Sequence, residues 1–334
     1  MKRIAVIGAG SWGTALAIIA ARKGHRVQLW SRNRAVVEGI NRQHLNPVYL
    51  REMQIPEGVV AGADILKTID SAEIIILAPP SHATRELLAT MTPALRTGMI
   101  IVSATKGIEI ETGKRISQLV ADVVPAEIAT PFVCLSGPSF AHEVVDNHPT
   151  AVVAASDDLE ASRAVQSELS TDNLRIYTND DVVGTELGGS VKNVMAIAAG
   201  MVDGLGFGAN SIAALITRGL AEMTRLALHE HAKLETMMGL AGLGDLVLTC
   251  TGCLSRNRFV GEELGKGRSL NEIVAGMSEI AEGIKTTLAI KNLSERLSVP
   301  MPITQEVHAV LYEGKPALDA ARQLMTRPLR EERN

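Results

Sequence analysis

The sequence of 334 residues is poor in aromatic side chains and has a small net charge. Aromatic residues make up 3% of the chain, which argues against the stacking platforms that bind single-stranded nucleic acids. The formal net charge of -4 gives no global attraction to nucleic acid or to an anionic membrane surface. We therefore expect no nucleic-acid partner.

Cysteine is also scarce, with only Cys134, Cys250 and Cys253 present. Three cysteines do not form a disulfide framework, and they indicate a reducing compartment, so we expect a cytoplasmic protein. Cys250 and Cys253 form a C-x-x-C pair. Neither a thioredoxin-like βαβ unit nor a second pair of zinc ligands accompanies them. We therefore expect no metal.

Long hydrophobic runs are missing as well. A transmembrane helix needs about 20 predominantly apolar residues, and no stretch beyond residue 22 approaches that length. The chain does start with Lys2 and Arg3 and a mostly apolar segment that ends near Ala21, which resembles a signal peptide with a small-residue cleavage site. Signal peptides lack patterned glycines, whereas this segment contains three. We therefore expect neither a signal peptide nor membrane insertion.

Those three glycines have a defined spacing. The apolar run 4–7 leads into Gly8, Gly10 and Gly13, and residues 14–21 have a helical pattern. Strand, glycine turn and helix in this order are the context in which a G-x-G-x-x-G motif indicates dinucleotide binding. Gly8 allows the tight turn, Gly10 lets the backbone approach a pyrophosphate, and Gly13 lets the helix pack close to the strand. The first helical N–H groups then point at the phosphates.

Apolar runs bounded by turn residues continue through the first half of the chain. Runs without polar alternation are typical of strands buried on both faces, as in a parallel sheet covered by helices. Residues 50–72 look short for a full strand and helix, and only residues 63–66 suggest one. Strands are predicted at 4–7, 25–30, 73–78, 99–103, 132–136 and 151–155, with crossover helices at 82–91 and 112–122.

From about residue 180 helical patterns replace the strand runs, and the chain is long for a single core. We predict an α/β protein with an N-terminal doubly wound Rossmann-type sheet, residues 1–178, followed by an all-helical C-terminal domain for substrate binding and catalysis, residues 179–330. The long apolar helices after residue 182 would bury either the domain core or the seam of a homodimer. Helices are predicted at 182–203, 209–231, 257–265, 270–276 and 284–297.

The end of the second strand bears on the form of the cofactor. An acidic residue at this place usually binds the ribose 2′-hydroxyl of NAD, and here there is none. Arg32 and Arg34 stand there instead, and arginine suits phosphate oxygens. We therefore predict NADP(H) as the preferred cofactor, with NAD(H) as the alternative. Two solvated surface arginines are the other interpretation.

Lys192 interrupts an otherwise apolar or small-residue helix in the second half. Gly188 and Gly189 precede it at helical spacing and leave room for a ligand or another backbone. An ammonium group in such a place loses solvation, which lowers its pKa toward a range useful for acid–base chemistry. Alternatively, Lys192 extends to the surface, with Glu186 and Asn193 as ordinary polar-face residues.

Two further stretches carry candidate polar groups. Three glycines in residues 239–244 precede Asp245, which suggests a carboxylate held where backbone packs closely. Ser255 is a good N-cap for a helix whose first turn carries Arg256, Asn257 and Arg258. Free N–H groups, the helix dipole and a guanidinium then favour an anion, here a phosphate on the substrate. A turn aspartate, a capping serine and a solvated Arg258 are the alternatives.

Together these segments resemble the NAD(P)-dependent glycerol-3-phosphate dehydrogenases, the bacterial-type enzyme in particular. A lone glycine motif would be a weak signal, whereas an ordered set that spans nearly the whole chain is specific. The departures are Pro79-Pro80 in place of a single proline and the short region 50–72. The matching segments, in family order, are 8–17, 105–109, 136–141, 186–193, 206–210, 242–246, 254–258 and 281–283.

The resemblance implies reversible reduction of dihydroxyacetone phosphate to sn-glycerol 3-phosphate, a precursor for phospholipid biosynthesis. It implies Lys192 as the proton donor and acceptor at the C2 oxygen. The substrate-binding residues that it implies are Lys106, Gly137, Ser139, Lys192, Asp245, Ser255, Arg256 and Asn257. With the glycines Gly8, Gly10 and Gly13, the cofactor-binding residues are Ser11, Trp12, Arg32, Tyr49, Lys106, Ala141, Arg256, Ile280 and Glu282.

Two other functions stay open from the sequence. Another two-domain nicotinamide dehydrogenase would act on a hydroxy acid or a sugar nucleotide. A catalytically inactive dinucleotide sensor would need the glycine motif alone. The joint presence of Lys192, Asp245 and the arginine-bearing helix start favours an enzyme over a sensor.

Overall fold

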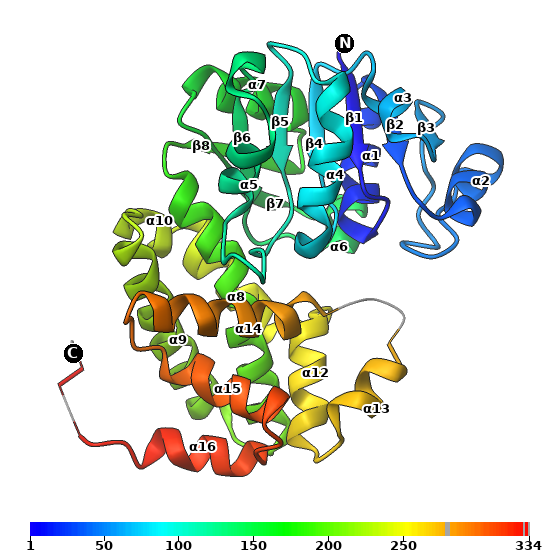
Figure 1. Ribbon diagram of the computed structural model, residues 1–334. Helices are drawn as coiled ribbons and strands as arrows, with labels where there is room; N and C mark the ends of the chain where they lie inside the picture. Colours follow the sequence, from blue (N-terminus) through cyan, green and yellow to red (C-terminus); the bar gives the residue numbers. More distant parts are fainter. Residues whose placement is uncertain (278–280, 330, 333–334) are drawn as a thin grey trace.

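A computed structural model describes residues 1–277, 281–329 and 331–332, and an eight-stranded sheet forms its N-terminal part (Figure 1). The spatial order is β3-β2-β1-β4-β5-β6-β7-β8. The strands are β1 (Arg3–Ile7), β2 (Arg26–Trp30), β3 (Val59–Gly62), β4 (Ile74–Leu77), β5 (Ile100–Ser103), β6 (Phe132–Ser136), β7 (Thr150–Ala155) and β8 (Leu174–Asn179). The sequence-based prediction of a doubly wound Rossmann-type sheet is confirmed.

One pair of strands departs from the expected parallel sheet. β6 and β7 are antiparallel, whereas the other neighbouring pairs are parallel. The only helix between them is α6 (Ala141–Val145), which has five residues. A helix of five residues rises about 7.5 Å, too little to carry the chain back along the sheet for a parallel strand.

Helices cover both faces of the sheet, which explains the continuous apolar runs. Along β1, Ile4 and Val6 belong to one buried cluster and Ala5 and Ile7 to another, because successive side chains of a strand point to opposite faces. Helix α1 packs in the first cluster, and α4 and α5 in the second (Figure 1). The helices of this part are α1 (Ser11–Arg22), α2 (Arg34–Gln43), α3 (Ile65–Ile69), α4 (Thr84–Met91), α5 (Ile116–Val123), α6 and α7 (Leu159–Leu169), with 3-10 turns η1 (Ser81–Ala83), η2 (Thr92–Ala94) and η3 (Ala126–Ile128).

The region 50–72 contains a strand and a helix that the sequence concealed. β3 pairs with β2, and the strand suggested at residues 63–66 is wrong: Asp64 caps α3, accepting hydrogen bonds from the N–H groups of Leu66 and Lys67. β8 was not predicted either, and it ends at Asn179. The division into domains near residue 178 stays a prediction.

The C-terminal part is helical, as predicted, and α8 (Val182–Gly204) runs from the sheet into its centre (Figure 1). Gly200 and Gly204 let α8 pack against the backbone of α12, because an added Cβ would lie 1.9 Å from Arg258 O and 2.1 Å from Glu262 O. The remaining helices are α9 (Ala209–His229), α10 (Leu234–Met238), the π-helical turn η4 (Leu240–Gly244), α11 (Asp245–Thr251), α12 (Arg256–Gly265), α13 (Leu270–Ala275), α14 (Glu282–Arg296), α15 (Pro302–Tyr312) and α16 (Ala317–Met325). Of these, α10, α11, α15 and α16 were not predicted.

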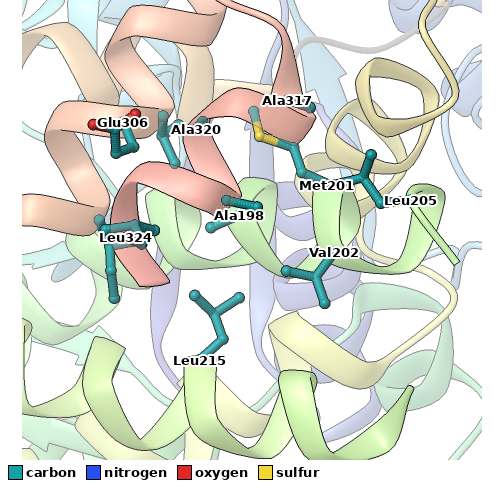
Figure 2. Close-up of a pocket in the computed structure, with 12 residues that line it drawn as sticks. Ala198, Met201, Val202, Leu205, Leu215, Glu306, Ala317, Ala320 and Leu324 are labelled. Atoms are coloured by element: carbon teal, nitrogen blue, oxygen red, sulfur yellow. The ribbon is translucent and has the colours of Figure 1, made fainter. Parts of the chain in front are cut away.

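A cavity of about 40 Å³ lies between α8, α9, α15 and α16 (Figure 2). Ala198 and Met201 of α8, Leu215 of α9 and Ala320 of α16 line it, and Glu306 of α15 is its charged neighbour. It contains none of the residues predicted for the functional site. Within the described parts of the chain, no helix combines the length and the apolar character needed to span a membrane.

Candidate active site

The glycine turn after β1 is built as a close-packed bend with one open position. Gly8 has φ +114°, and a Cβ there would lie 2.8 Å from Ala78 O. A Cβ on Gly13 would lie 1.9 Å from Gly8 O. A Cβ on Gly10, the N-cap of α1, would meet nothing within 4 Å. Gly8 and Gly13 therefore shape the turn, and Gly10 leaves space where an anion can approach the first N–H groups of α1, which begins with Ser11 and Trp12.

A buried asparagine that the sequence did not single out ties a second loop to this turn. Asn46 Nδ2 donates to Ala9 O at 3.0 Å and to Thr14 Oγ1 at 2.9 Å. Its Oδ1 accepts from the N–H groups of Val48 and Tyr49, at 3.1 and 3.0 Å. Asn46 is fully buried. The half-buried Tyr49 is therefore held beside the glycine turn, where it was predicted to contact the cofactor.

Arg32 lies beyond the end of β2 and is exposed. Its neighbour Asn33 caps α2, so the chain turns away after Arg32. Burial, Lys285 and Arg32 lower the pKa of His82 in η1, and the charge of Glu111 opposes them. Arg32 and Lys285 therefore lie within electrostatic range of His82, with an acidic side chain also nearby.

The centre of the candidate site is one carboxylate shared by two lysines. Lys192 Nζ donates to Asp245 Oδ1 at 2.6 Å, and Lys106 Nζ donates to Asp245 Oδ2 at 2.8 Å. Lys192 also donates to Thr249 Oγ1 at 2.7 Å, and Lys106 to Gly137 O at 2.9 Å. The structure thus brings together four residues predicted from distant parts of the sequence, and adds Thr249.

Small residues make the space for this group. A Cβ on Gly188 would lie 2.5 Å from Ala241 O, and one on Gly189 would lie 2.6 Å from Ser136 Oγ and 3.7 Å from Lys106 Cγ. Gly188 therefore lets η4, which leads into Asp245, approach α8, and Gly189 leaves room for the Ser136 hydroxyl, beside the stem of Lys106. The Lys192 side chain is only 7% exposed, so its ammonium group loses solvation, as its glycine neighbours predicted, and does not extend to the surface.

The electrostatics of the centre favour proton transfer by Lys192. Burial lowers its pKa to about 8 from 10.5, and nearby Lys106 also lowers it, while the charge of Asp245 opposes the change. Burial raises the pKa of Glu282, at the start of α14, to about 7, against the opposing charges of Arg256, Lys192 and Lys106. Lys192 and Glu282, whose pKa values are both shifted toward neutrality, therefore lie within electrostatic range of each other and of Lys106, a pattern typical of active sites.

The start of α12 has the predicted helix cap, but its polar side chains contact different partners. Ser255 Oγ accepts from Arg258 N–H at 3.2 Å, and the exposed Arg256 is close enough to Glu282 to influence its pKa. Asn257 links three helices, donating to Asn193 Oδ1 at 3.0 Å and accepting from Gly283 N–H at 2.9 Å. Arg256 therefore lies within electrostatic range of Glu282, and Asn257 ties the start of α12 to α8 and α14.

Arg258 points elsewhere. Its Nη2 donates to Asp203 Oδ2 at 2.6 Å, at the far end of α8. Its Nη1 also lies 3.4 Å from Glu262 Oε2, and its side chain is 22% exposed, so Arg258 is paired with two carboxylates and is not a solvated arginine. Asn193 and Glu186, left open as polar-face residues, are both buried.

The remaining predicted residues lie on the loops at the sheet edge. Ser139 Oγ donates to Gly137 O at 3.0 Å. Gly137 has φ +137°, and an added Cβ there would also lie 2.9 Å from Val152 Cα, so this position requires glycine. Ala141 begins α6. Ile280 lies outside the described residues. No cluster of three or more His, Cys, Asp or Glu side chains suited to a metal ion occurs in the described part of the chain.

A dinucleotide-type glycine turn at the carboxyl edge of a doubly wound sheet, with a buried lysine of lowered pKa supplied by the following helices, defines a nicotinamide-dependent oxidoreductase of two parts. Residues 3–162 match the family model described as NAD-dependent glycerol-3-phosphate dehydrogenase N-terminus, and residues 181–322 match its C-terminus counterpart. The chain belongs to the NAD-dependent glycerol-3-phosphate dehydrogenase family.

Individual relatives agree with the family models. A glycerol-3-phosphate dehydrogenase [NAD(P)+] from Koribacter versatilis is 52% identical over 330 residues, covering 98% of each chain. One from Nitratidesulfovibrio vulgaris is 51% identical, covering 99% of this chain and all of its own. The crystal structure of glycerol-3-phosphate dehydrogenase from Coxiella burnetii superposes with a TM-score of 0.94 at 40% identity, covering 98% of this chain and 99% of that one.

Proposed function

We propose that this enzyme interconverts dihydroxyacetone phosphate and sn-glycerol 3-phosphate, using NADP(H) in preference to NAD(H). The observation that carries the proposal is the buried ammonium of Lys192, held by Asp245 and Thr249. The relatives named glycerol-3-phosphate dehydrogenase support the choice of substrate. The product would supply phospholipid biosynthesis.

The residues at the sheet edge fit a nicotinamide dinucleotide. The open position at Gly10 gives a pyrophosphate access to the first N–H groups of α1, including those of Ser11 and Trp12. Arg32 would bind the 2′-phosphate, and Tyr49 would contact the dinucleotide from the loop that Asn46 anchors. Glu282, at the start of α14, would contact the cofactor from the helical part of the chain. When bound, the cofactor supplies the hydride that is exchanged with the C2 carbon.

Lys192 and Lys106 would act on the C2 oxygen of the substrate. With a pKa of about 8, the Lys192 ammonium is protonated at neutral pH and can donate its proton as the ketone becomes an alcohol. In the reverse direction the neutral amine accepts that proton. Lys106, held at Gly137 O and Asp245, would polarise the ketone. Asp245 keeps both ammonium groups oriented.

The substrate phosphate would bind at the start of α12. The helix N-terminus offers backbone N–H groups and a positive dipole, and Arg256 adds a guanidinium. The side chain of Asn257 is engaged by Asn193 and Gly283, so Asn257 would contribute its backbone N–H group. Gly137 and Ser139, which follow β6, would line the other side of the substrate site, at the carboxyl edge of the sheet.

A direct assay tests the proposal. The oxidation of NADPH is followed with dihydroxyacetone phosphate, then with unphosphorylated dihydroxyacetone, and both are repeated with NADH. We expect turnover with the phosphorylated ketone, little with the unphosphorylated one, and a lower KM for NADPH than for NADH. Turnover only with a 2-keto acid or a sugar nucleotide would show that the substrate is wrong, and cofactor binding without turnover of any ketone would indicate a sensor.

A further inference from the structure

Glu186 of α8 is a buried carboxylate that the proposed chemistry does not use. Its Oε1 accepts from Ser117 N–H at 2.7 Å, and its Oε2 accepts from Ser117 Oγ at 2.6 Å and from Arg115 Nη1 at 2.8 Å. The side chain of Glu186 is 4% exposed and that of Arg115 is 12% exposed. Ser117 is the second residue of α5, so a residue of the helical part caps a helix of the sheet layer.

These partners stand at one end of the segment that carries Lys106. The segment leaves β5 at Ser103 and enters α5 at Ile116. At its first end, Thr105 Oγ1 donates to Pro79 O at 2.9 Å, next to β4. At its other end, Arg115 and Ser117 bind Glu186. Between these ends, the carboxylate of Glu109 accepts from Arg85 of α4 at 2.7 and 2.9 Å. Lys106 is therefore on a span fixed to the sheet and α4 on one side and to α8 at its far end.

Helix α8 also carries Lys192, six positions after Glu186 and therefore about 9 Å farther along the helix axis. The contact of both lysines with Asp245 requires that the Lys106 segment and α8 keep one relative position. Each oxygen of the Asp245 carboxylate is used by one lysine, at 2.8 and 2.6 Å, so a shift of the segment breaks one of the two contacts.

We propose that Glu186, through Arg115 and Ser117, is a positioning residue that sets Lys106 against Lys192 on the shared carboxylate of Asp245. This inference rests on the proposed function for its kinetic consequence. Glu186 touches neither substrate nor cofactor in this assignment. Its effect on catalysis is transmitted by the segment that it anchors. That segment brings Lys106 to the site from the sheet, whereas α8 brings Lys192 from the helical part.

The arrangement is not one that stability alone explains. Burying a carboxylate costs free energy, and burial raises the pKa of Glu186 although Arg115 and Ser117 oppose this. Arg115 Nε is buried without a hydrogen-bond partner among the described residues. An apolar contact between α5 and α8 would avoid both costs, but it would not fix the relative position of the two helices as three hydrogen bonds donated to one carboxylate do.

The chain offers a matched control for this carboxylate. Glu222 of α9 is also buried, and burial also raises its pKa. Its oxygens accept from the N–H groups of Ile303 and Thr304 and from Thr304 Oγ1, at 2.8 to 2.9 Å, at the start of α15. Glu222 thus also caps a helix with a buried carboxylate, in its case without an arginine donor, and both of its partners belong to the helical part and not to the segment that carries Lys106.

The test compares Glu186→Gln with Glu222→Gln, each below its own unfolding temperature. We expect Glu186→Gln to lower kcat for dihydroxyacetone phosphate about 10- to 100-fold, since a misplacement of about 1 Å can cost about 100-fold. The Kd for NADPH, measured by fluorescence titration, should stay within about twofold. Glu222→Gln should lower the unfolding temperature but leave kcat of the folded enzyme within about twofold. A crystal structure of Glu186→Gln should show a longer distance from Lys106 Nζ to Asp245 Oδ2.

A milder variant covers the case in which Glu186→Gln does not fold. Ser117→Ala removes one of the three donors, and we expect a severalfold lower kcat with unchanged NADPH binding. A kcat within twofold of the unmutated enzyme in the folded variants, or an unchanged distance from Lys106 to Asp245, overturns the inference. Failure of the proposed function has a different signature, because the unmutated enzyme would then not turn over dihydroxyacetone phosphate, while the distance would still report on positioning.

Discussion

The ammonium groups of Lys106 and Lys192 meet on a single carboxylate, that of Asp245, with one lysine on each oxygen. Lys106 follows the carboxyl end of β5 in the sheet, and Lys192 belongs to α8, the central helix of the C-terminal part. The contact therefore exists only when both parts of the chain are in place. Burial, followed by the repulsion from Lys106, outweighs the attraction of Asp245, so the pKa of Lys192 settles near 8.

Removal of the Lys192 ammonium should abolish turnover without loss of cofactor binding. Lys192→Met keeps an unbranched side chain in the buried space but has no proton to donate. Positioned proton transfer contributes about 10²- to 10⁴-fold, so kcat should fall by that factor. The Kd for NADPH should change little. Lys266→Met, at an exposed lysine paired with Glu262 and Glu263, is the control and should retain full activity. Near-normal kcat in Lys192→Met would refute the role of this residue.

The two directions of the reaction should respond oppositely to pH. Ketone reduction needs the protonated form of Lys192, so its kcat should fall as the pH rises through about 8. Alcohol oxidation needs the neutral amine, so its kcat should rise through the same pH. Glu282, with a pKa of about 7, also titrates nearby, and the measurement is therefore repeated at saturating NADPH in Glu282→Gln. A transition near pH 8 that disappears in this variant would assign the titration to Glu282.

The sequence predicted the parts of the fold that depend on local pattern. β1, β4, β5 and β6 are buried on both faces, and their continuous apolar runs show this. β3 was missed because its four residues include a half-exposed Val60 and end in glycine, a signal too short to stand out. β8 was missed because exposed Arg175 and Tyr177 alternate with buried residues, as expected for an edge strand.

The site was predictable only where a residue type was unusual for its surroundings. Lys192 stood out in an apolar helix, and Asp245 stood out after three glycines. Thr249 and Asn46 did not, because a threonine in a helix and an asparagine in a loop are common, and their partners lie 57 and 37 residues away in the sequence. Arg115 likewise acquires meaning only from its contact with Glu186, 71 residues away.

Arg32 should decide between the two forms of the cofactor. Arg32→Ala removes a guanidinium from the predicted 2′-phosphate site, and a hydrogen bond to a charged group contributes about 1.5 to 3 kcal/mol. The KM for NADPH should therefore rise about 10- to 100-fold, while the KM for NADH changes less than twofold. Arg26→Ala, at the opposite end of β2, is the control. Equal increases for both cofactors would show that Arg32 does not recognise the 2′-phosphate.

Asn46 should matter for cofactor affinity although it is fully buried. Asn46→Ala frees the loop that carries Tyr49 from Ala9 O and Thr14, so the KM for NADPH should rise severalfold while kcat at saturation stays within about twofold. Asn41→Ala is the matched control. Asn41 makes two hydrogen bonds with the backbone of Ala61, which tie α2 to β3 and not to the glycine turn. An equal rise in KM for both variants would indicate general destabilisation of this part of the sheet.

Two alanine substitutions in the glycine turn should separate folding from binding. In Gly13→Ala the new Cβ would lie 1.9 Å from Gly8 O, a backbone atom that cannot move freely, so overpacking should cost about 1 to 3 kcal/mol of stability and lower the Tm. Gly10 has φ -72°, which any residue adopts, and its Cβ would meet nothing within 4 Å. Gly10→Ala should therefore keep its Tm but place a methyl group where the pyrophosphate approaches, and raise the Kd for NADPH at least about tenfold. Thermal unfolding without cofactor and fluorescence titration with NADPH give the two readouts. If Gly10→Ala bound NADPH as tightly as the unmutated enzyme, the pyrophosphate would not lie against this turn.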